Sequence, residues 1–368
     1  MKVLFLGPLP PPVNGHALAA KVFLDDLRVR HDIEVVDLSV DSKGDGSITP
    51  GRLSAVVRVL WSVFRKRRGV DVVYLTIAES LAGNLKDLVI YGLCWRLLPR
   101  MYIHLHGGSI ESELFDRYPL VRKINAAFIR RMAGVIISGE SHLRIFAAMI
   151  DPARIHVSAN FAEEPLFVDE PAVLRKFAAM QPLRLLYISN MIPMKGFDEL
   201  ADAYLGLPPG VRQHLKLDFA GRFDGEANRA RFLAKISGSE GIRYHGVVDN
   251  ARKVELFSQA HVFCLPSAFK EGQPISILEA YASGCVVVTT GQPGIRDVFR
   301  EGVNGFEVEP RSVHSLATRL RLLVTDSEGL RPIALTNLRT AAELYRTSSY
   351  NARLSRIVER AAVSRADG

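Results

Sequence analysis

The sequence predicts an α/β fold built from two doubly wound domains with parallel sheets. In the first half, short apolar runs alternate with helical stretches, and these runs occupy residues 3–6, 33–38, 70–75, 101–105, 135–138 and 155–157. The second half repeats the alternation, with runs at residues 183–188, 215–220, 242–247, 261–265, 285–289 and 306–308. Such alternation is typical of parallel strands joined by crossover helices. We therefore expect each half to form a Rossmann-like domain.

The length of the chain also favours two domains. Its 368 residues exceed what one hydrophobic core usually holds. After Asn160 the sequence becomes irregular and acidic through residues 163–171, before the strand pattern restarts at residue 183. We place the boundary in this stretch, which gives a first domain of residues 1–164 and a second domain of residues 165–344. The tail from residue 313 onward is helical by pattern.

The composition is that of an ordinary soluble globular protein, with 48% hydrophobic and 23% charged residues. No run of eighteen apolar residues is present, so no membrane-spanning helix is predicted. The chain opens directly into the apolar run without a signal-peptide pattern, which predicts a cytoplasmic location. Cys94, Cys264 and Cys285 lack metal-ligand spacing and lie in apolar surroundings, so we expect buried, reduced thiols.

The net charge of +8 favours anionic partners such as nucleotides, phosphorylated substrates, nucleic acid or acidic lipid. Residues 52–68 contain six Lys or Arg and no acid. Apolar residues recur there at helical spacing, namely Leu53, Val56, Val57, Leu60, Trp61 and Phe64.

Two compatible interpretations fit this basic segment. In one, its basic end lies on an anionic membrane face, which a second basic cluster at residues 117–131 supports. In the other, the apolar stripe packs on the first sheet while the basic end is solvated. We prefer packing for the stripe, because it runs directly into the apolar run at residue 70. No nucleic-acid-binding motif accompanies these charges, so no nucleic-acid partner is predicted.

Two carboxylates, Glu271 and Glu279, stand eight positions apart after the apolar run at residues 261–265. Pro274 suits the first turn of a helix and Gly284 suits its C-terminal stop, so Glu271 is expected in a loop and Glu279 inside the helix. Open α/β sheets bind ligands where a strand ends and a helix begins, and the helix start attracts phosphate. A loop glutamate there can hold sugar hydroxyls, and Glu279 can accept hydrogen bonds from a ribose diol. The common alternative is two solvated carboxylates.

This segment also has characteristic neighbours: Pro-Ser before it, then Glu-Ala, Ala-Ser-Gly and a valine-rich run after it. In this context it resembles the Glu-x7-Glu motif of the retaining nucleotide-sugar glycosyltransferases of family 4. The resemblance spans roughly residues 2–310 and implies the GT-B architecture, in which two Rossmann-like domains face a central cleft. It implies an acceptor-binding first domain and a donor-binding second domain. It also implies that a last helix, at about residues 345–368, packs back on the first domain.

The first strand-to-helix turn is rich in proline and glycine and ends at Gly15 and His16. It does not match the Gly-x-Gly-x-x-Gly fingerprint. Gly15 would let the backbone approach a diphosphate closely. The resembled family often has two adjacent glycines at this place, and His16 occupies the second. His16 therefore either contacts donor or acceptor, or caps the helix at the surface.

A second turn resembles the family's Gly-Arg-Leu-x-x-x-Lys-Gly, and its Lys195 is suited to a diphosphate leaving group. The alternative for Lys195 is a solvated surface lysine. The family's arginine falls on Asn190, which has no charge. We expect either compensation by Arg222, which follows the matched Gly221, or reduced activity.

Another departure is Pro274, where family members often have glycine, because proline has no N–H to offer a phosphate. The amides of Ile275 and Ser276 remain available for phosphate binding. His104 and His106 lie on one face of a predicted strand, so a two-histidine metal site is one interpretation. The resemblance implies a metal-independent enzyme instead, with His106 beside the transferred sugar. His104 lies one pleat deeper in the strand, so we expect it to be structural. We expect no metal and no cofactor.

The resulting prediction is a retaining transfer of a hexose from a nucleotide diphosphate sugar to an acceptor hydroxyl. By resemblance, Glu279 binds the ribose, Glu271 the transferred sugar and Lys195 the diphosphate. Family habit and the basic segments favour a lipid-linked acceptor in cell-envelope polysaccharide or lipopolysaccharide assembly, met at the inner face of the membrane. An alternative, indicated by Asn190, is a catalytically impaired subunit that only binds nucleotide sugar. A nucleotide-sugar epimerase is disfavoured, because the Glu-x7-Glu match belongs to transferases.

Overall fold

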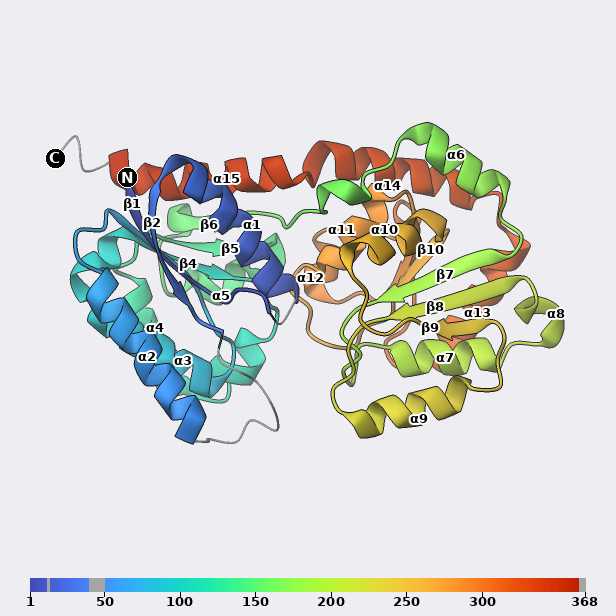
Figure 1. Cartoon of the computed structure of the whole chain (residues 1–368), viewed down its shortest axis with the longest axis horizontal. Coiled ribbons are helices and arrows are strands. Elements are labelled where there is room, and N and C mark those ends of the chain that lie inside the picture. The colour runs from blue at the N-terminus through green and yellow to red at the C-terminus, as the bar shows by residue number, and fades with distance from the viewer. Residues whose placement is uncertain (12–13, 40–49, 364–368) are drawn as a thin grey trace. The chain divides into compact units, whose positions relative to one another are not determined.

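The computed structural model describes residues 1–11, 14–39 and 50–363. The chain divides into two compact units, unit 1 with Met1–Ala159 and Ser348–Gly368, and unit 2 with Asn160–Thr347 (Figure 1). The division after Ala159 comes slightly earlier than the sequence boundary at residues 164/165. The reason is that Asn160 already bonds within unit 2, where its side-chain amide donates to the Gln273 carbonyl at 2.8 Å.

Unit 1 contains a six-stranded parallel sheet in the order β2-β1-β3-β4-β5-β6. The strands are β1 (Lys2–Gly7), β2 (Asp32–Asp37), β3 (Val72–Thr76), β4 (Met101–Leu105), β5 (Gly134–Ile137) and β6 (Ile155–Val157). Strands β3, β4 and β5 are buried along their whole length, as expected where helices cover both faces of a parallel sheet. The chain reverses its direction of winding at β1, which has β2 on one side and β3 on the other.

The helices of unit 1 lie on both faces of this sheet. They are α1 (Gly15–Arg30), α2 (Pro50–Lys66), α3 (Leu81–Leu93), the 3-10 helix η1 (Trp95–Arg100), the π-helix η2 (Glu111–Phe115), α4 (Pro119–Ile129), α5 (Leu143–Ala147) and α15 (Thr347–Val363). Figure 1 shows α2, α3 and α4 on one side of the sheet and α1 and α15 on the other. From Ser348 onward α15 belongs to unit 1, where the Glu359 carboxylate accepts a hydrogen bond from the Arg30 guanidinium at 2.9 Å.

Helix α2 buries only part of the stripe that the sequence indicated, since Leu60 packs against the core. Leu53, Val57 and Trp61 are 60%, 57% and 59% exposed, so the preferred interpretation of a fully packed stripe is wrong for these residues. Val59 and Val63 pack into the core instead. The buried residues differ from the predicted ones because the apolar positions of α2 cover two neighbouring faces of the helix. Only one of these faces meets the sheet.

Unit 2 repeats the architecture with a sheet in the order β12-β11-β10-β7-β8-β9, again parallel. Its strands are β7 (Leu183–Ile188), β8 (Leu215–Ala220), β9 (Ile242–Tyr244), β10 (Val262–Leu265), β11 (Val286–Thr289) and β12 (Gly305–Glu307). The predicted α/β architecture of two Rossmann-like domains is thereby confirmed. Strand β9 is shorter than predicted, because Gly246 turns the chain with a φ of 73°.

The helices of unit 2 are α6 (Glu170–Ala178), α7 (Phe197–Leu205), α8 (Pro209–Arg212), α9 (Glu226–Ile236), α10 (Asn250–Gln259), α11 (Ile275–Ala282), α12 (Pro293–Arg296), α13 (Val313–Thr325) and α14 (Leu330–Leu344). Helix α11 begins after Pro274 and is followed by Gly284 with a φ of 60°, as predicted. Among the described residues of the whole chain, no helix has the length and apolar character needed to cross a bilayer.

Candidate functional site

Lys195 and Glu271 meet at the point where unit 2 reverses its direction of winding. Strand β7 has β8 on one side and β10 on the other, and such switch points are where open α/β sheets bind ligands. Lys195 lies in the loop after β7, and Glu271 lies in the loop after β10. The ammonium of Lys195 contacts both carboxylate oxygens, at 2.8 and 2.9 Å. The pairing of β7 with β10 therefore brings together two residues that are far apart in sequence.

The pair is held in a fixed geometry. The Ser267 hydroxyl donates to Glu271 Oε1 at 2.7 Å, and the Lys195 ammonium lies over the Phe269 ring at 5.2 Å from its centre. The side chains of Lys195 and Glu271 are only 14% and 8% exposed, so the surface-lysine alternative is wrong. An ammonium has three N–H donors, which leaves one for a further acceptor such as a phosphate oxygen. Sequence reasoning missed the role of Ser267, although the Pro-Ser match contained it.

The loop that carries Lys195 depends on Gly196. This residue has a φ of 79°, and a Cβ there would lie 2.2 Å from the Pro266 carbonyl oxygen. The Tyr187 hydroxyl donates to the Lys195 carbonyl at 3.3 Å and fixes the loop from the strand side. Gly196 thus allows the loop after β7 to approach the end of β10.

Glu279 interacts with other residues than the Lys195–Glu271 pair. It is buried inside α11, where its carboxylate pairs with Lys253 of α10 at 2.8 Å, and Lys253 also pairs with Glu163. Within the described residues, no hydrogen bond or ion pair joins Glu279 to Lys195 or Glu271. Sequence reasoning missed Lys253 and Glu163, because neither stands in a motif near Glu279.

One ammonium therefore serves two carboxylates. Burial raises the pKa of Glu279, the charge of Lys253 lowers it again in part, and the charge of Glu163 adds to the rise. Burial alone would lower the pKa of Lys253, but Glu279 and Glu163 outweigh burial and leave that pKa raised. The lysine thus remains charged at neutral pH, and Glu279 is the carboxylate that most needs this cation or a hydrogen-bond donor.

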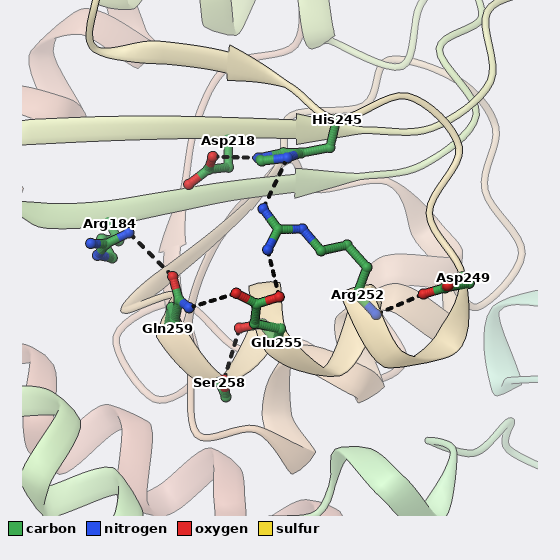
Figure 2. A network of polar contacts seen from close by, with 8 residues as sticks. All are labelled: Arg184, Asp218, His245, Asp249, Arg252, Glu255, Ser258 and Gln259. Atoms are coloured by element: carbon green, nitrogen blue, oxygen red, sulfur yellow. Dashed lines mark hydrogen bonds and ion pairs between the residues drawn. The ribbon is translucent and has the colours of Figure 1, made fainter.

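A polar network anchors the helix that carries Lys253 (Figure 2). His245 Nε2 bonds the Asp218 carboxylate of β8 at 2.6 Å, and Arg252 of α10 contacts His245 Nδ1 at 3.2 Å. Arg252 also pairs with Glu255, which in turn accepts from Gln259 at 3.2 Å. These contacts tie α10 to the sheet and position Lys253, the residue after Arg252. No motif in the sequence indicated this network.

The remaining predicted residues of unit 2 flank the switch point. Gly221 has a φ of 145°, and a Cβ there would lie 1.8 Å from the Ser189 carbonyl oxygen. The Met191 amide donates to the Arg222 carbonyl at 2.8 Å. The backbone next to Asn190 therefore adjoins the backbone at Arg222. Asn190 is half-buried, whereas Arg222 is exposed and has no ion-pair partner among the residues that the structure describes. Compensation by Arg222 stays a prediction.

Ile275 and Ser276 are the first two residues of α11, and no side chain caps this helix. Amides in the first turn of a helix have no partner within it, so they are available to an anion. Their use in phosphate binding stays a prediction.

Three histidines, His16, His104 and His106, cluster in unit 1 at the carboxyl ends of β1 and β4. The ring centres of His104 and His106 are 3.9 Å apart, and those of His16 and His106 are 4.7 Å apart. His104 Nδ1 bonds the Tyr74 hydroxyl at 2.6 Å, which agrees with the structural role implied for it. Gly15 and His16 open α1, but Asn14 is its cap, accepting from the Ala17 amide at 2.9 Å. The interpretation of His16 as a surface cap is therefore wrong.

The three imidazoles are neutral at pH 7. The pKa of His16 is lowered to about 4, mainly by burial and secondarily by the charge of Lys86. The pKa of His104 is lowered to about 3, mainly by burial and secondarily by the charge of His16. The pKa of His106 is also lowered, chiefly by burial. Both ring nitrogens of His106 are inaccessible to solvent and lack a hydrogen-bond partner among the described residues. Among the residues that the structure describes, no group of three His, Cys, Asp or Glu side chains is arranged to hold a metal ion.

Known proteins match part of this chain in sequence. The family model described as "Glycosyl transferases group 1" matches residues 174–342. A phosphatidyl-myo-inositol mannosyltransferase of Mycobacterium leprae is 33% identical over 135 residues, which are 36% of this chain and 34% of that protein. The match thus spans about a third of the length of this curated relative.

Solved structures match over nearly the whole chain. Anabaena Alr3699/HepE, solved in complex with UDP, superposes with a TM-score of 0.73 at 17% identity, covering 98% of this chain and 100% of that one. WaaG, a glycosyltransferase involved in lipopolysaccharide biosynthesis, superposes with a TM-score of 0.69 at 16% identity, covering 97% and 99%. These likenesses establish the shared fold. The family match adds that residues 174–342 are similar in sequence to the group 1 glycosyl transferases.

Proposed function

We propose that this protein is a retaining glycosyltransferase that moves a hexose from a nucleotide diphosphate sugar to an acceptor hydroxyl. The observation that carries the proposal is the Lys195–Glu271 ion pair at the switch point between β7 and β10. This pair lies in the segment that matches the group 1 glycosyl transferases. A fold neighbour was solved with UDP, which supports a nucleotide-linked donor.

In this proposal, unit 2 binds the donor. Lys195 directs an N–H toward the diphosphate, Glu271 holds the transferred sugar through its hydroxyls, and the Ile275 and Ser276 amides receive a phosphate. Glu279 accepts from the ribose diol, kept ionised by Lys253. As the sugar bond breaks, the leaving phosphate oxygen takes the acceptor proton from the same face. Preorganised charge thus stabilises the leaving group without a metal or cofactor.

Unit 1 binds the acceptor in this proposal. His106 lies beside the transferred sugar, and Gly15 lets the backbone approach the donor. The acceptor is a lipid-linked sugar of cell-envelope polysaccharide or lipopolysaccharide assembly, and the protein works on the cytoplasmic side of the membrane. This acceptor class is supported by the similarity to the M. leprae phosphatidyl-myo-inositol mannosyltransferase and by the fold shared with WaaG, a glycosyltransferase involved in lipopolysaccharide biosynthesis.

Thermal-shift screening against UDP, GDP and their sugar conjugates tests the donor class. A ligand at a hundred times its dissociation constant adds about 2.7 kcal/mol to the free energy of unfolding. We expect one nucleotide series to raise the unfolding temperature, and Lys195→Ala to weaken that effect. If no nucleotide raised the unfolding temperature, the proposal would be wrong. Product analysis by proton NMR then reports whether the anomeric configuration is retained.

A second candidate is a catalytically impaired subunit that only binds nucleotide sugar. Asn190 favours it, because it stands where related enzymes carry arginine and because the side chain of Arg222 is exposed. Donor binding without hydrolysis or transfer would support this version. An Asn190→Arg variant that gains turnover would show that the missing charge limits the chemistry.

A further inference from the structure

The outer surface of one helix layer in unit 1 carries regularly spaced apolar side chains. On α2 these are the exposed Leu53, Val57 and Trp61, four residues apart. The neighbouring elements α3, η1 and α4 add further exposed side chains, namely Leu85, Val89, Trp95, Leu120 and Ile124. Single exposed apolar residues are ordinary, but a contiguous series on adjacent helices marks an interaction surface.

These helices share one face of the sheet. Val63 of α2, Ile90 of α3 and Ile129 of α4 all belong to the same buried core. Figure 1 shows the three helices side by side beneath the sheet of unit 1. Their exposed apolar residues therefore point away from the sheet and form one surface, which we term the α2–α4 face.

The α2–α4 face is cationic and almost free of acids. Helices α2 and α4 and η1 contain no Asp or Glu, and the one acid of α3, Asp87, is fully buried. Basic side chains are interspersed among the apolar ones. Arg58, Arg65, Arg96, Arg122 and Lys123 have no ion-pair partner within the described ranges of the chain.

A hollow of about 450 Å³ adjoins Trp61 at the end of α2. Arg65 and Arg68 line it, and so do Lys2, Lys66 and Glu34. The two lysines neutralise Glu34, at 3.3 and 3.8 Å, so both arginines remain available to an anion. A cationic hollow beside an exposed indole suits a phosphate head group next to acyl chains.

We propose that the α2–α4 face docks the protein on an anionic lipid bilayer. The apolar residues would enter the boundary between head groups and acyl chains, while the arginines and lysines meet lipid phosphates. A second copy of this chain fits less well, because two such faces would bring like charges together. Nucleic acid fits less well, because most of the exposed apolar residues are aliphatic and offer no stacking surface to bases. The inference deepens the proposed function, since it names the surface that would meet a lipid-borne acceptor.

The two tryptophans of the chain, Trp61 and Trp95, both lie on this face. Tryptophan fluorescence therefore reports directly on docking without any label. The full-length protein is mixed with phosphatidylcholine vesicles, with or without phosphatidylglycerol. With the anionic vesicles, we expect co-flotation, a blue shift of the emission, and quenching by brominated acyl chains.

Two variants separate the apolar and cationic contributions. R58Q/R65Q/R68Q should weaken vesicle binding on the order of 100-fold at low salt, since each cation near an anionic surface contributes roughly fivefold, or about 1 kcal/mol. L53Q/V57Q, which keeps both tryptophans, should weaken binding at least roughly tenfold through lost apolar insertion. The matched controls V29Q/L322Q and R175Q/R300Q/R331Q change exposed residues on other elements and should bind like the parent protein.

Three results would overturn the inference. They are no binding to anionic vesicles, binding without a change of tryptophan emission, and equal losses in the face variants and their controls. Self-association that L53Q/V57Q abolishes, with no vesicle binding, would assign the face to contact between copies. Circular dichroism of each variant checks that the fold is intact. No sugar donor enters this assay, so its failure leaves the transferase proposal standing, and a failure to bind nucleotide leaves this inference standing.

Discussion

Two partly buried lysines of unit 2 neutralise carboxylates in different ways. Lys195 serves Glu271 alone, at a place where loops from adjacent strands meet. Lys253 serves both Glu279 and Glu163 from a helix. A buried carboxylate without its cation is costly, so each lysine has a structural effect as well as a proposed role in donor binding.

Lys253→Met should destabilise unit 2 by about 3 to 5 kcal/mol at pH 7, because it leaves the buried Glu279 and the partly buried Glu163 without their cation. Glu279 then keeps a raised pKa, so the folded state binds a proton more readily than the unfolded chain. The loss should therefore shrink as the pH falls toward 5, and urea unfolding at the two pH values measures it.

Lys235→Met is the control for this experiment. Its ion pairs with Asp198 and Asp202 lie nearer to solvent, so it should cost at most about 1 kcal/mol. Similar losses in the two variants would contradict the account of Lys253.

The sequence predicted Lys195 and Glu271 because each stands in a local motif that follows an apolar run. Their direct contact follows from the pairing of β7 with β10, which periodicity alone does not define. Glu163 and Lys253 could not be predicted, since they reach Glu279 from segments distant in sequence. His16 could be recognised as a departure from the family pattern, but its packing against His106 could not.

At the level of elements, the start of α7 depends on a backbone conformation that other residues adopt poorly. Gly196→Ala should destabilise the protein by about 1 to 3 kcal/mol, because φ is positive and the added Cβ would strike the Pro266 carbonyl. The same substitution should displace Lys195 and lower donor turnover.

Gly210→Ala is a matched control, since a Cβ there meets nothing within 4 Å. Thermal unfolding together with a turnover assay compares the two variants. A Gly196→Ala protein as stable and active as the control would disprove the dependence on this glycine.

The buried histidine cluster at the carboxyl ends of β1 and β4 should make the stability of unit 1 depend on pH. The folded pKa of His16 is about 4, below the unfolded value, so its contribution is present above the unfolded pKa and is lost as the pH falls. Between pH 7.5 and 5 the loss from His16 is about 2 kcal/mol, and His104 and His106 act in the same direction. Asp87, whose pKa burial raises to about 6, opposes part of this loss.

Denaturant titrations at pH 7.5 and 5 measure this dependence. His16→Asn should reduce it, while His314→Asn, on the partly exposed start of α13, serves as the control. An unchanged slope in His16→Asn would contradict the burial of a neutral imidazole.

At the scale of the whole molecule, the alternation of apolar runs predicted both parallel sheets and most of their strands. The order of the strands did not follow from that pattern, because any right-handed doubly wound sheet shares it. The exposed stripe of α2 was misjudged for a related reason. Helical spacing identifies an apolar face, but it does not say whether the sheet or an external partner covers it.

The central claim is that Lys195 and Glu271 act together on one diphosphosugar. A double-mutant cycle tests it, with turnover of the identified donor measured for Lys195→Ala, Glu271→Ala and the double variant. We predict that each single variant loses on the order of 100-fold in turnover and that the double variant loses little more, which gives a coupling of about 2 to 3 kcal/mol. The exposed pair Arg339–Glu170, at 3.2 Å, is the control and should change turnover little. Independent, multiplying losses, or turnover near that of the parent protein, would contradict the claim.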